Sequence, residues 1–156
     1  MKNILIIGGT KGIGKSIVDE LVDENKITCF SRNKSDFNHK NYTHLEFDAL
    51  SDEYPDMNDL DCLIYCPGSI NLKPISTLTI DDFRNDFEIN VIGAVRAIKK
   101  YLPLLKKSTS ASILLFSTVA TKLGMPYHAS VSVAKSGVDG LVTVSYTHLR
   151  AHETKA

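Results

Sequence analysis

An apolar run that breaks at a glycine-rich turn constrains this chain more than any other feature. Residues 3–18 read NILIIGGTKGIGKSIV, and Ile4–Ile7 show no polar alternation, as expected of a parallel strand buried on both faces. The turn follows at once and opens into apolar residues at helical spacing, Ile13, Ile17, Val18 and Leu21. The pattern predicts a strand, a tight turn and a helix in immediate succession.

The turn itself carries four glycines, Gly8, Gly9, Gly12 and Gly14. Glycine removes the side chain where a phosphate must approach the backbone, and the unpaired amides and positive dipole end of the next helix favour negative charge. A turn that merely packs the strand against the helix would use the same residue type. Because strand, turn and helix occur together, we favour a dinucleotide-binding turn over a packing turn.

Composition bounds the fold and the partners. The chain has 156 residues, of which 43% are hydrophobic and 23% are charged, as is ordinary for one globular domain. Eighteen basic residues balance eighteen acidic ones, so we expect neither nucleic acid nor an anionic membrane as a partner. The N-terminal apolar run is too short to span a bilayer and does not resemble a signal peptide, so we expect a cytoplasmic protein.

The cysteines are predicted to be core residues. Cys29, Cys62 and Cys66 are an odd number in a chain without a secretory signal, which argues against a disulfide framework. Cys62 and Cys66 fall in one expected strand, which would hold them about 13 Å apart. That separation is too long for a disulfide and unsuited to a shared metal ion, so we expect no metal site.

Strands and helices alternate along the rest of the chain. The expected strands are Ile27–Ser31, His44–Phe47, Asp61–Cys66 and Ser112–Ser117, with a polar loop at Arg32–Tyr42. The last expected helix runs from about Ser130 to Val142. This alternation, without an internal repeat or a linker, predicts the α/β class with a doubly wound parallel sheet.

A longer helix is expected between the fourth and fifth strands. Thr79 is its predicted N-cap, with Asp82 three residues on completing a capping box, and the helix should stop near Pro103. One face is traced by Phe83, Phe87, Asn90, Ala94 and Ile98. Because an unpaired amide on an apolar face is costly, Asn90 needs a buried partner.

Several motifs, taken in order, resemble the short-chain dehydrogenase/reductase family. The resemblance covers Met1 to about Thr143 and rests on GGTKGIG at 8–14, Asp48 after the third strand, NVIG at 90–93, and Lys135. It implies a Rossmann fold with sheet order 3-2-1-4-5 and the cofactor over the switch between strands one and four. It further implies an oxidoreductase that acts on a small-molecule carbonyl or alcohol and forms a homo-oligomer.

The resemblance also assigns the cofactor contacts. They are Gly8, Thr10, Lys11, Gly12, Ile13, Gly14, Ser31, Arg32, Asp48, Gly68, Asn90 and Lys135. Asp48 matches the family's adenine-contacting acid. Residues 65–68 depart from the family, because they read Tyr-Cys-Pro-Gly where the family has Asn-Asn-Ala-Gly, and only the glycine is kept.

Charge at the end of the second strand predicts which cofactor binds. A fold selective for the unphosphorylated cofactor places an acid there for the ribose hydroxyls, whereas a 2′-phosphate requires a cation. Here Ser31 occupies the place of the acid, Arg32 offers a planar fork for phosphate, and Lys11 adds a second positive charge. We therefore expect NADP(H) to be favoured over NAD(H), against the alternative that Arg32 is a solvated loop residue.

The family's catalytic tyrosine is missing. Its position, one helical turn before Lys135, holds Val131, whose side chain neither donates nor accepts a proton. Asn90 and Lys135 match the family's catalytic asparagine and lysine. Thr118, thirteen residues before Val131, takes the serine position and keeps a hydroxyl, with Ser117 as the other candidate.

His128 is the candidate replacement for the tyrosine. It precedes Val131 by three residues and can project toward the same side of the helix, and histidine titrates in the useful range. The alternative is a structural histidine that caps the turn after Met125 and Pro126. Tyr127 also carries a phenol, but it is shifted four residues from the family's position.

The last residues look foreign to the rest of the chain. From Val144 the sequence reads VSYTHLRAHETKA, which resembles an in-frame translation of a transposase-type sequencing adapter. We expect a dinucleotide-binding domain at 1–143 and a non-native tail at 144–156, the alternative being a genuine C-terminal helix. On that expectation His148 and His152 are not site residues, the native protein continues with further strands, and the fifth strand is an open apolar edge.

Two functions are compatible with these residues. The first is an NADP(H)-dependent oxidoreductase of short-chain dehydrogenase/reductase type, with Asn90, Thr118, Lys135 and His128 as catalytic residues. The second is a non-catalytic NAD(P)-binding sensor or scaffold that kept the cofactor turn and lost the catalytic tyrosine; Val131 favours it, whereas Asn90 and Lys135 would then have no obvious role.

Overall fold

Five strands form one sheet in the order β3-β2-β1-β4-β5, as the resemblance implied. The strands are β1 (Asn3–Ile7), β2 (Lys26–Ser31), β3 (Tyr42–Glu46), β4 (Cys62–Tyr65) and β5 (Ser112–Leu115). β1 pairs in parallel with β2 and β4, and β2 pairs in parallel with β3. β1 is central, which explains its unbroken apolar sequence, because both of its faces are covered.

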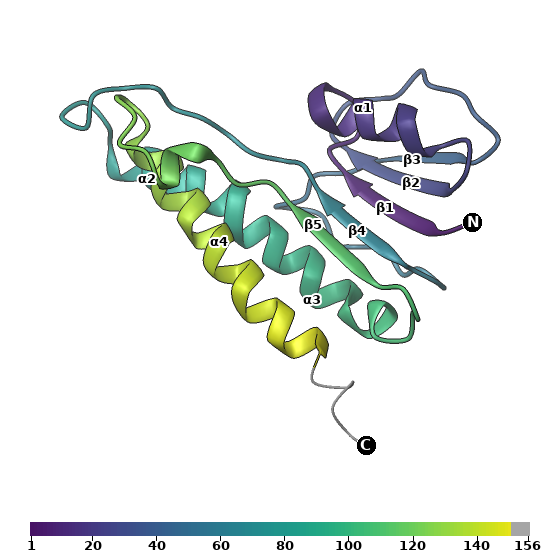
Figure 1. Ribbon diagram of the computed structural model, residues 1–156. Helices are drawn as coiled ribbons and strands as arrows, with labels where there is room; N and C mark the ends of the chain where they lie inside the picture. Colours follow the sequence, from purple (N-terminus) through teal and green to yellow (C-terminus); the bar gives the residue numbers. More distant parts are fainter. Residues whose placement is uncertain (151–156) are drawn as a thin grey trace. The chain divides into compact units, whose positions relative to one another are not determined.

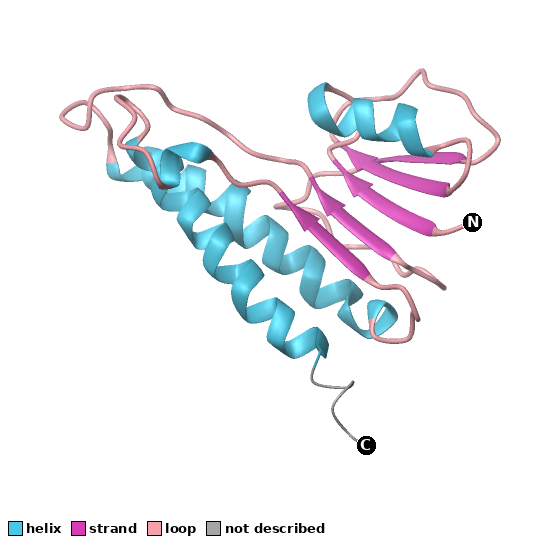
Figure 2. Ribbon diagram, in the orientation of Figure 1, coloured by secondary structure: helices cyan, strands magenta, loops and turns pink. Residues whose placement is uncertain are grey.

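The computed structural model describes residues 1–150, and the side chains of residues 1–144. The chain divides into two compact units. Figure 1 colours the chain along its sequence, and Figure 2 colours it by helix, strand and loop. The first unit comprises Met1–Pro67 and Gly93–Leu114, and the second comprises Gly68–Ile92 and the chain from Leu115 onward. The units are therefore interleaved in sequence.

In the first unit, helices cover both faces of the sheet. α1 (Gly12–Leu21) lies over one face and α3 (Gly93–Leu105) over the other (Figure 1). The largest side chains of this core that are almost fully buried are Leu5, Ile6, Ile7, Ile27, Leu63, Tyr101 and Leu105. Burying such aliphatic side chains stabilises the fold by about 1.5–3 kcal/mol each. The doubly wound architecture predicted from the alternation of elements is confirmed.

The second unit is helical. It holds α2 (Ile80–Phe87), the π-helical segment η1 (Glu88–Ile92), the 3₁₀ turn η2 (Val119–Thr121) and α4 (Ala129–Arg150). The predicted cap of α2 is confirmed: the Asp82 amide donates to Thr79 Oγ1 over 3.1 Å, and the Thr79 amide donates to Asp82 Oδ2 over 2.9 Å. Both bonds satisfy amides that a helix start otherwise leaves unpaired.

The predicted continuous helix before Pro103 is wrong in its middle. The π segment at Glu88–Ile92 inserts a wider turn, which rotates the residues before it relative to those after it. Phe87 is 39% exposed, whereas Asn90 and Ala94 remain buried on the predicted face. Pro103 lies inside α3, in its last turn, and the helix ends two residues later, at Leu105. Only one backbone hydrogen bond is lost to a proline at that position.

The boundaries of other elements also shift. β3 begins at Tyr42 and ends at Glu46, because pairing with β2 rather than the apolar pattern decides an edge strand. β5 ends at Leu115, two residues early. α4 continues to Arg150 instead of stopping at Val142. The side chains of residues 145–150, with His148, and all of residues 151–156, with His152, lie outside the described part, so the expectation of a non-native tail stays a prediction.

Of the three cysteines predicted to be core residues, Cys29 is buried as predicted, whereas Cys62 and Cys66 are only half-buried. Burial raises the pKa of the Cys29 thiol. No group of three metal-ligating side chains occurs among residues 1–144. In the described part of the chain, no helix is both long and apolar enough to cross a membrane.

Candidate cofactor and catalytic site

The turn between β1 and α1 admits only glycine at several positions. Gly8 and Gly12 have φ angles of +82° and +53°, a region that side chains disfavour. A Cβ on Gly14 would lie 2.3 Å from the Gly8 carbonyl oxygen, and one on Gly9 would lie 2.8 Å from Cys29 Sγ. The backbone therefore folds on itself too closely for side chains, while no described atom lies within 4 Å of a Cβ placed on Gly12.

The N-terminus of α1 faces this turn without a side-chain cap. Lys11, the N-cap residue, has extended backbone, and its side chain is exposed and makes no capping hydrogen bond within the described structure. The first amides of the helix are thus available to an anion, whose charge the helix dipole favours. Thr10 is half-buried and Ile13 is exposed beside the same turn. That this turn binds a pyrophosphate stays a prediction, which the uncapped helix start supports.

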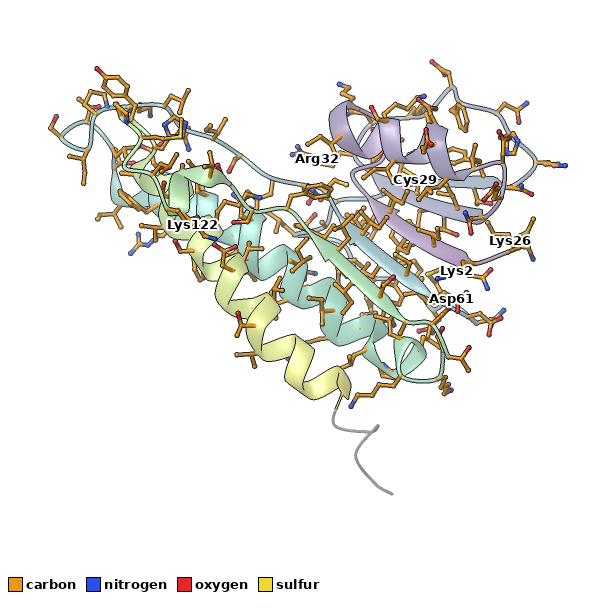
Figure 3. All side chains as sticks on the ribbon, in the orientation of Figure 1. Lys2, Lys26, Cys29, Arg32, Asp61 and Lys122 are labelled. Carbon is orange, nitrogen blue, oxygen red and sulfur yellow. The ribbon has the colours of Figure 1, made fainter. Side chains whose placement is uncertain are left out.

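At the end of β2 the structure places a hydroxyl and a guanidinium. Ser31 is 7% exposed, and its Oγ donates to the Asn33 carbonyl over 2.8 Å. The same Oγ lies 2.9 Å from His44 Nε2 on the neighbouring strand β3. Arg32, the next residue, is exposed beside the carboxyl end of β2 (Figure 3).

Asp48, the predicted adenine contact, is half-buried and organises its own loop. Its Oδ1 accepts from the Leu50 amide over 2.8 Å, and its amide donates to Asp52 Oδ2 over 2.7 Å. The loop is therefore held in shape by local hydrogen bonds. Its contact with a cofactor stays a prediction.

Tyr65 stands where the family has an asparagine, and its larger side chain changes the local packing. Its hydroxyl would lie 2.0 Å from a Cβ on Gly93, so the first residue of α3 must lack a side chain. Burial raises the pKa of the Tyr65 phenol, which therefore stays protonated at neutral pH. Tyr65 therefore packs closely against Gly93 within the first unit.

In the second unit, Gly68, Asn90 and Lys135 come together from three distant stretches of sequence. Asn90 Oδ1 lies 2.9 Å, and Lys135 Nζ 3.5 Å, from the point that a Cβ on Gly68 would occupy. Lys135 Nζ also donates to the Phe116 carbonyl over 2.7 Å. The structure therefore gathers three of the predicted site residues in one place.

Asn90 has the buried partner that the sequence required. It is 2% exposed, and its Nδ2 donates to the Asp86 carbonyl over 2.8 Å and to Ser69 Oγ over 3.5 Å. Its Oδ1 is buried and has no hydrogen-bond partner among the described residues. One acceptor of the amide is thus left for a bound water or ligand group.

A buried carboxylate beside Asn90 was not anticipated. Asp86 is fully buried, and its Oδ1 accepts from Ser69 Oγ and from Asn71 Nδ2, the latter over 3.1 Å. Its Oδ2 has no hydrogen-bond partner in the described part of the chain. The signal in the sequence was the spacing of Asp86 and Asn90, which are four residues apart and so share a helix face.

Thr118 and Val131 lie in the second unit as well. Thr118 is the N-cap of η2, where its Oγ1 accepts from the Ala120 amide over 3.3 Å. Val131 is 4% exposed, in the first turn of α4 and four residues before Lys135. The tyrosine position of the family therefore holds a buried aliphatic side chain.

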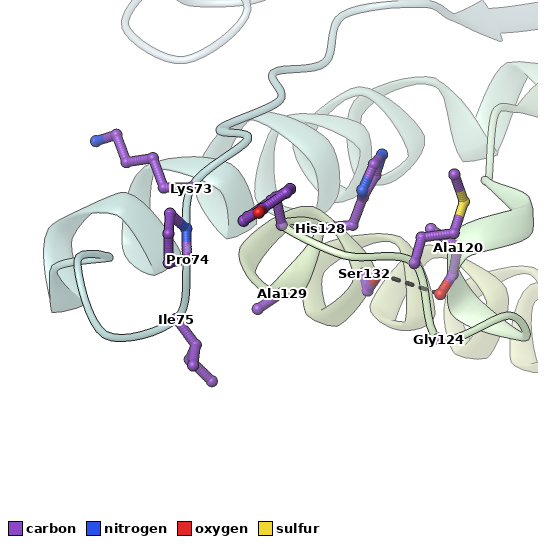
Figure 4. Close-up of a pocket in the computed structure, with 10 residues that line it drawn as sticks. Lys73, Pro74, Ile75, Ala120, Gly124, His128, Ala129 and Ser132 are labelled. Atoms are coloured by element: carbon purple, nitrogen blue, oxygen red, sulfur yellow. Dashed lines mark hydrogen bonds between the residues drawn. The ribbon is translucent and has the colours of Figure 1, made fainter.

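His128 lines a cavity of about 420 Å³ in the second unit (Figure 4). The cavity is bounded by Lys73, Pro74, Ile75, Ala120, Gly124, Met125, Tyr127, His128, Ala129 and Ser132. His128 Nδ1 lies 2.6 Å from the Pro126 carbonyl, which can only accept, so this nitrogen carries a proton. In the neutral ring Nε2 then keeps its lone pair. Ser132, which the sequence did not single out, donates to the Ala120 carbonyl over 3.1 Å.

Comparison with known proteins identifies similar chains. The family model described as short chain dehydrogenase matches residues 43–155. An uncharacterized oxidoreductase of Bacillus subtilis, YvrD, is 24% identical over 157 residues, which cover 90% of this chain and 60% of that protein. A tropinone reductase homolog of Arabidopsis thaliana is 28% identical over 161 residues, with the same two coverages.

Solved structures share the fold. The structure of ElxO with NADP bound superposes with a TM-score of 0.80 at 21% identity, over 96% of this chain and 70% of that one. The chain thus spans about 60% of the length of the two curated relatives named above.

Proposed function

The chain belongs to the short chain dehydrogenase family, and from that premise we propose that it is an NADP(H)-dependent oxidoreductase acting on a small carbonyl or alcohol. The observation that supports this best is the glycine turn. Gly14 packs against the Gly8 carbonyl so closely that a side chain is excluded, and the uncapped start of α1 follows directly. This is the geometry that a pyrophosphate needs.

Charge supports the phosphorylated cofactor. Arg32 is exposed at the end of β2, where selectivity for NAD(H) would require an acid, and Lys11 lies exposed in the glycine turn. Among the solved structures of similar fold, ElxO carries NADP. Glu46 on β3 is the register partner of Ser31, and the charge of Arg32 must outweigh that of this acid.

We assign the catalytic roles to residues of the second unit. When bound, a nicotinamide would supply or accept the hydride exchanged with the substrate carbon. Lys135 would hold the nicotinamide ribose, and the buried Asn90 would order a proton path through its open Oδ1. Thr118 Oγ1 already accepts from an amide, so its own proton is available to polarise a substrate oxygen.

The acid–base residue in this proposal is His128, whose Nε2 accepts a proton in the neutral ring and donates one when both ring nitrogens are protonated. Val131 cannot serve, whereas the imidazole lines a cavity and presents Nε2 once Nδ1 is held by the Pro126 carbonyl. The cavity walls are mostly apolar, which suits a substrate with a hydrophobic body. Ion pairing with Asp82, at 3.2 Å, neutralises Lys73 at the rim.

The test is cofactor titration by calorimetry. Replacing Arg32 by Ala should weaken NADPH by about 1.5–3 kcal/mol, the size of a charged hydrogen bond, and leave NADH nearly unchanged. Arg84→Ala is the matched control, because Arg84 is an exposed arginine in α2 paired with Asp81. Equal losses for both cofactors in the Arg32 variant would contradict the NADP(H) assignment.

Val131 supports a second candidate, a non-catalytic NAD(P)-binding sensor or scaffold. The two candidates differ in turnover with a panel of carbonyl compounds. An inactive protein that gains activity on Val131→Tyr would favour the sensor, because only the missing acid would then separate it from an enzyme.

A further inference from the structure

We propose that His44 is a positioning residue which, through Ser31, holds the turn that carries Arg32 in the shape that receives a 2′-phosphate. This inference rests on the NADP(H) preference proposed above and adds a residue to it. His44 lies on β3, opposite Cys29 in the register, and its side chain reaches across to the last residue of β2. All of these residues belong to the first unit.

The direction of each hydrogen bond follows from chemistry. Ser31 Oγ lies 2.8 Å from the Asn33 carbonyl, which can only accept, so the single hydroxyl proton of Ser31 points there. The 2.9 Å contact with His44 must then run from Nε2–H to Ser31 Oγ. His44 therefore carries a proton on Nε2, and the donors form a relay from His44 through Ser31 to Asn33.

This relay closes a short turn around Arg32. The Ser31 hydroxyl reaches the carbonyl two residues on, so Arg32 stands at the apex of the turn, and its side chain is exposed (Figure 3). A guanidinium on a fixed backbone loses less conformational entropy when it binds an anion than one on a free loop. Hydrogen bonds in a chain also polarise one another, which strengthens the pair that holds Asn33.

The relay also assigns Ser31 a different role from that of a direct ligand. Its proton is already given to Asn33, so the hydroxyl has none left for a phosphate oxygen. Phosphate recognition then falls to Arg32 and Lys11, and Ser31 acts on the backbone beneath Arg32. Loss of either His44 or Ser31 should therefore act through the same turn.

The experiment measures the binding of two probes, 2′,5′-ADP, which carries the 2′-phosphate, and 5′-AMP, which lacks it. His44→Leu should weaken 2′,5′-ADP by about three- to tenfold, the size of one neutral hydrogen bond, and leave 5′-AMP unchanged. His44→Gln should restore binding, because its amide Nε2 can donate from a similar place. Thr43→Val, an exposed neighbour on β3, is the matched control.

A double-mutant cycle tests the relay itself. Ser31→Ala should reproduce the loss, and the double variant with His44→Leu should bind 2′,5′-ADP no more weakly than either single one, since both remove the same relay. Additive losses would overturn the relay. A His44→Leu variant that keeps full preference for 2′,5′-ADP would overturn the inference and leave the proposed function standing.

If the unaltered chain binds both probes equally, the NADP(H) proposal fails and the positioning role fails with it. A cofactor-free measurement separates the two cases and needs no variant. Nitrogen-15 spectra of the imidazoles should show the Nε2-protonated tautomer for neutral His44. An Nδ1-protonated ring would overturn the inference whatever the cofactor preference.

Discussion

At position 131 the chain carries a buried valine where the family's chemistry would need an acid. In the same unit, Asn90 Oδ1 and Lys135 Nζ lie beside the point that a Cβ on Gly68 would occupy. His128, three residues earlier, presents one ring nitrogen in a cavity. At the scale of single residues, the question is therefore which group delivers the proton.

If His128 is that group, His128→Ala should lower turnover by about a hundredfold or more, the usual cost of losing a positioned general acid. The variant should also lose one limb of the pH–rate profile and bind NADPH as before. Steady-state kinetics on a carbonyl substrate measures the turnover and its pH profile, and calorimetry measures the binding of NADPH. His39→Ala, which removes a histidine of the first unit that pairs with Asp23, serves as the control, and unchanged turnover in the His128 variant would reject the assignment.

Among the elements, α2 shows how local chemistry sets a helix start. Thr79 and Asp82 exchange hydrogen bonds, and the bond from the Thr79 amide is the main cause that lowers the pKa of Asp82 from its ordinary value of 3.8. The helix then passes into the π segment at Glu88–Ile92, which holds Asn90. The capping box thus marks the start of α2, and the π segment follows directly after its end.

Thr79→Ala should lower the free energy of unfolding by about 1 kcal/mol, the usual cost of a lost N-cap. Urea melts at pH 7 measure this loss.

Because the folded pKa of Asp82 is depressed, the stability that its carboxylate contributes is present above pH 3.8 and is lost as the pH falls through the folded value. The stability difference between the unaltered chain and Asp82→Asn should therefore shrink below pH 3.8. Urea melts from pH 7 to pH 2.5 measure this, and a constant difference would contradict the cap assignment.

For the whole molecule, cofactor binding and stability are linked. A ligand that binds only the folded chain stabilises it in proportion to its occupancy, by about 2.7 kcal/mol at one hundred times its Kd. NADPH should therefore raise the melting temperature more than NADH at the same concentration. In the Arg32→Ala variant the difference between the two shifts should shrink, as thermal melts followed by circular dichroism would show. Equal shifts in the unaltered chain would count against a preference for NADP(H).

The sequence by itself determined the features that depend on neighbours in the chain. The β1–turn–α1 unit follows from an apolar run and glycines within twelve residues, and the cap at Thr79 from a spacing of three. The sheet order came from the family resemblance, and the parallel sheet from the alternation of elements. Such patterns are readable because each is set by local backbone geometry and by burial on one face.

Only the tertiary structure decided the features that depend on residues far apart. The burial of Asp86 against Ser69, the relay from His44 to Ser31, and the meeting of Gly68 with Lys135 all join separate segments. The π segment likewise has no local pattern in the sequence. Hydrogen bonds between distant polar side chains depend on how the elements pack, and packing is a property of the folded chain rather than of any window of its sequence.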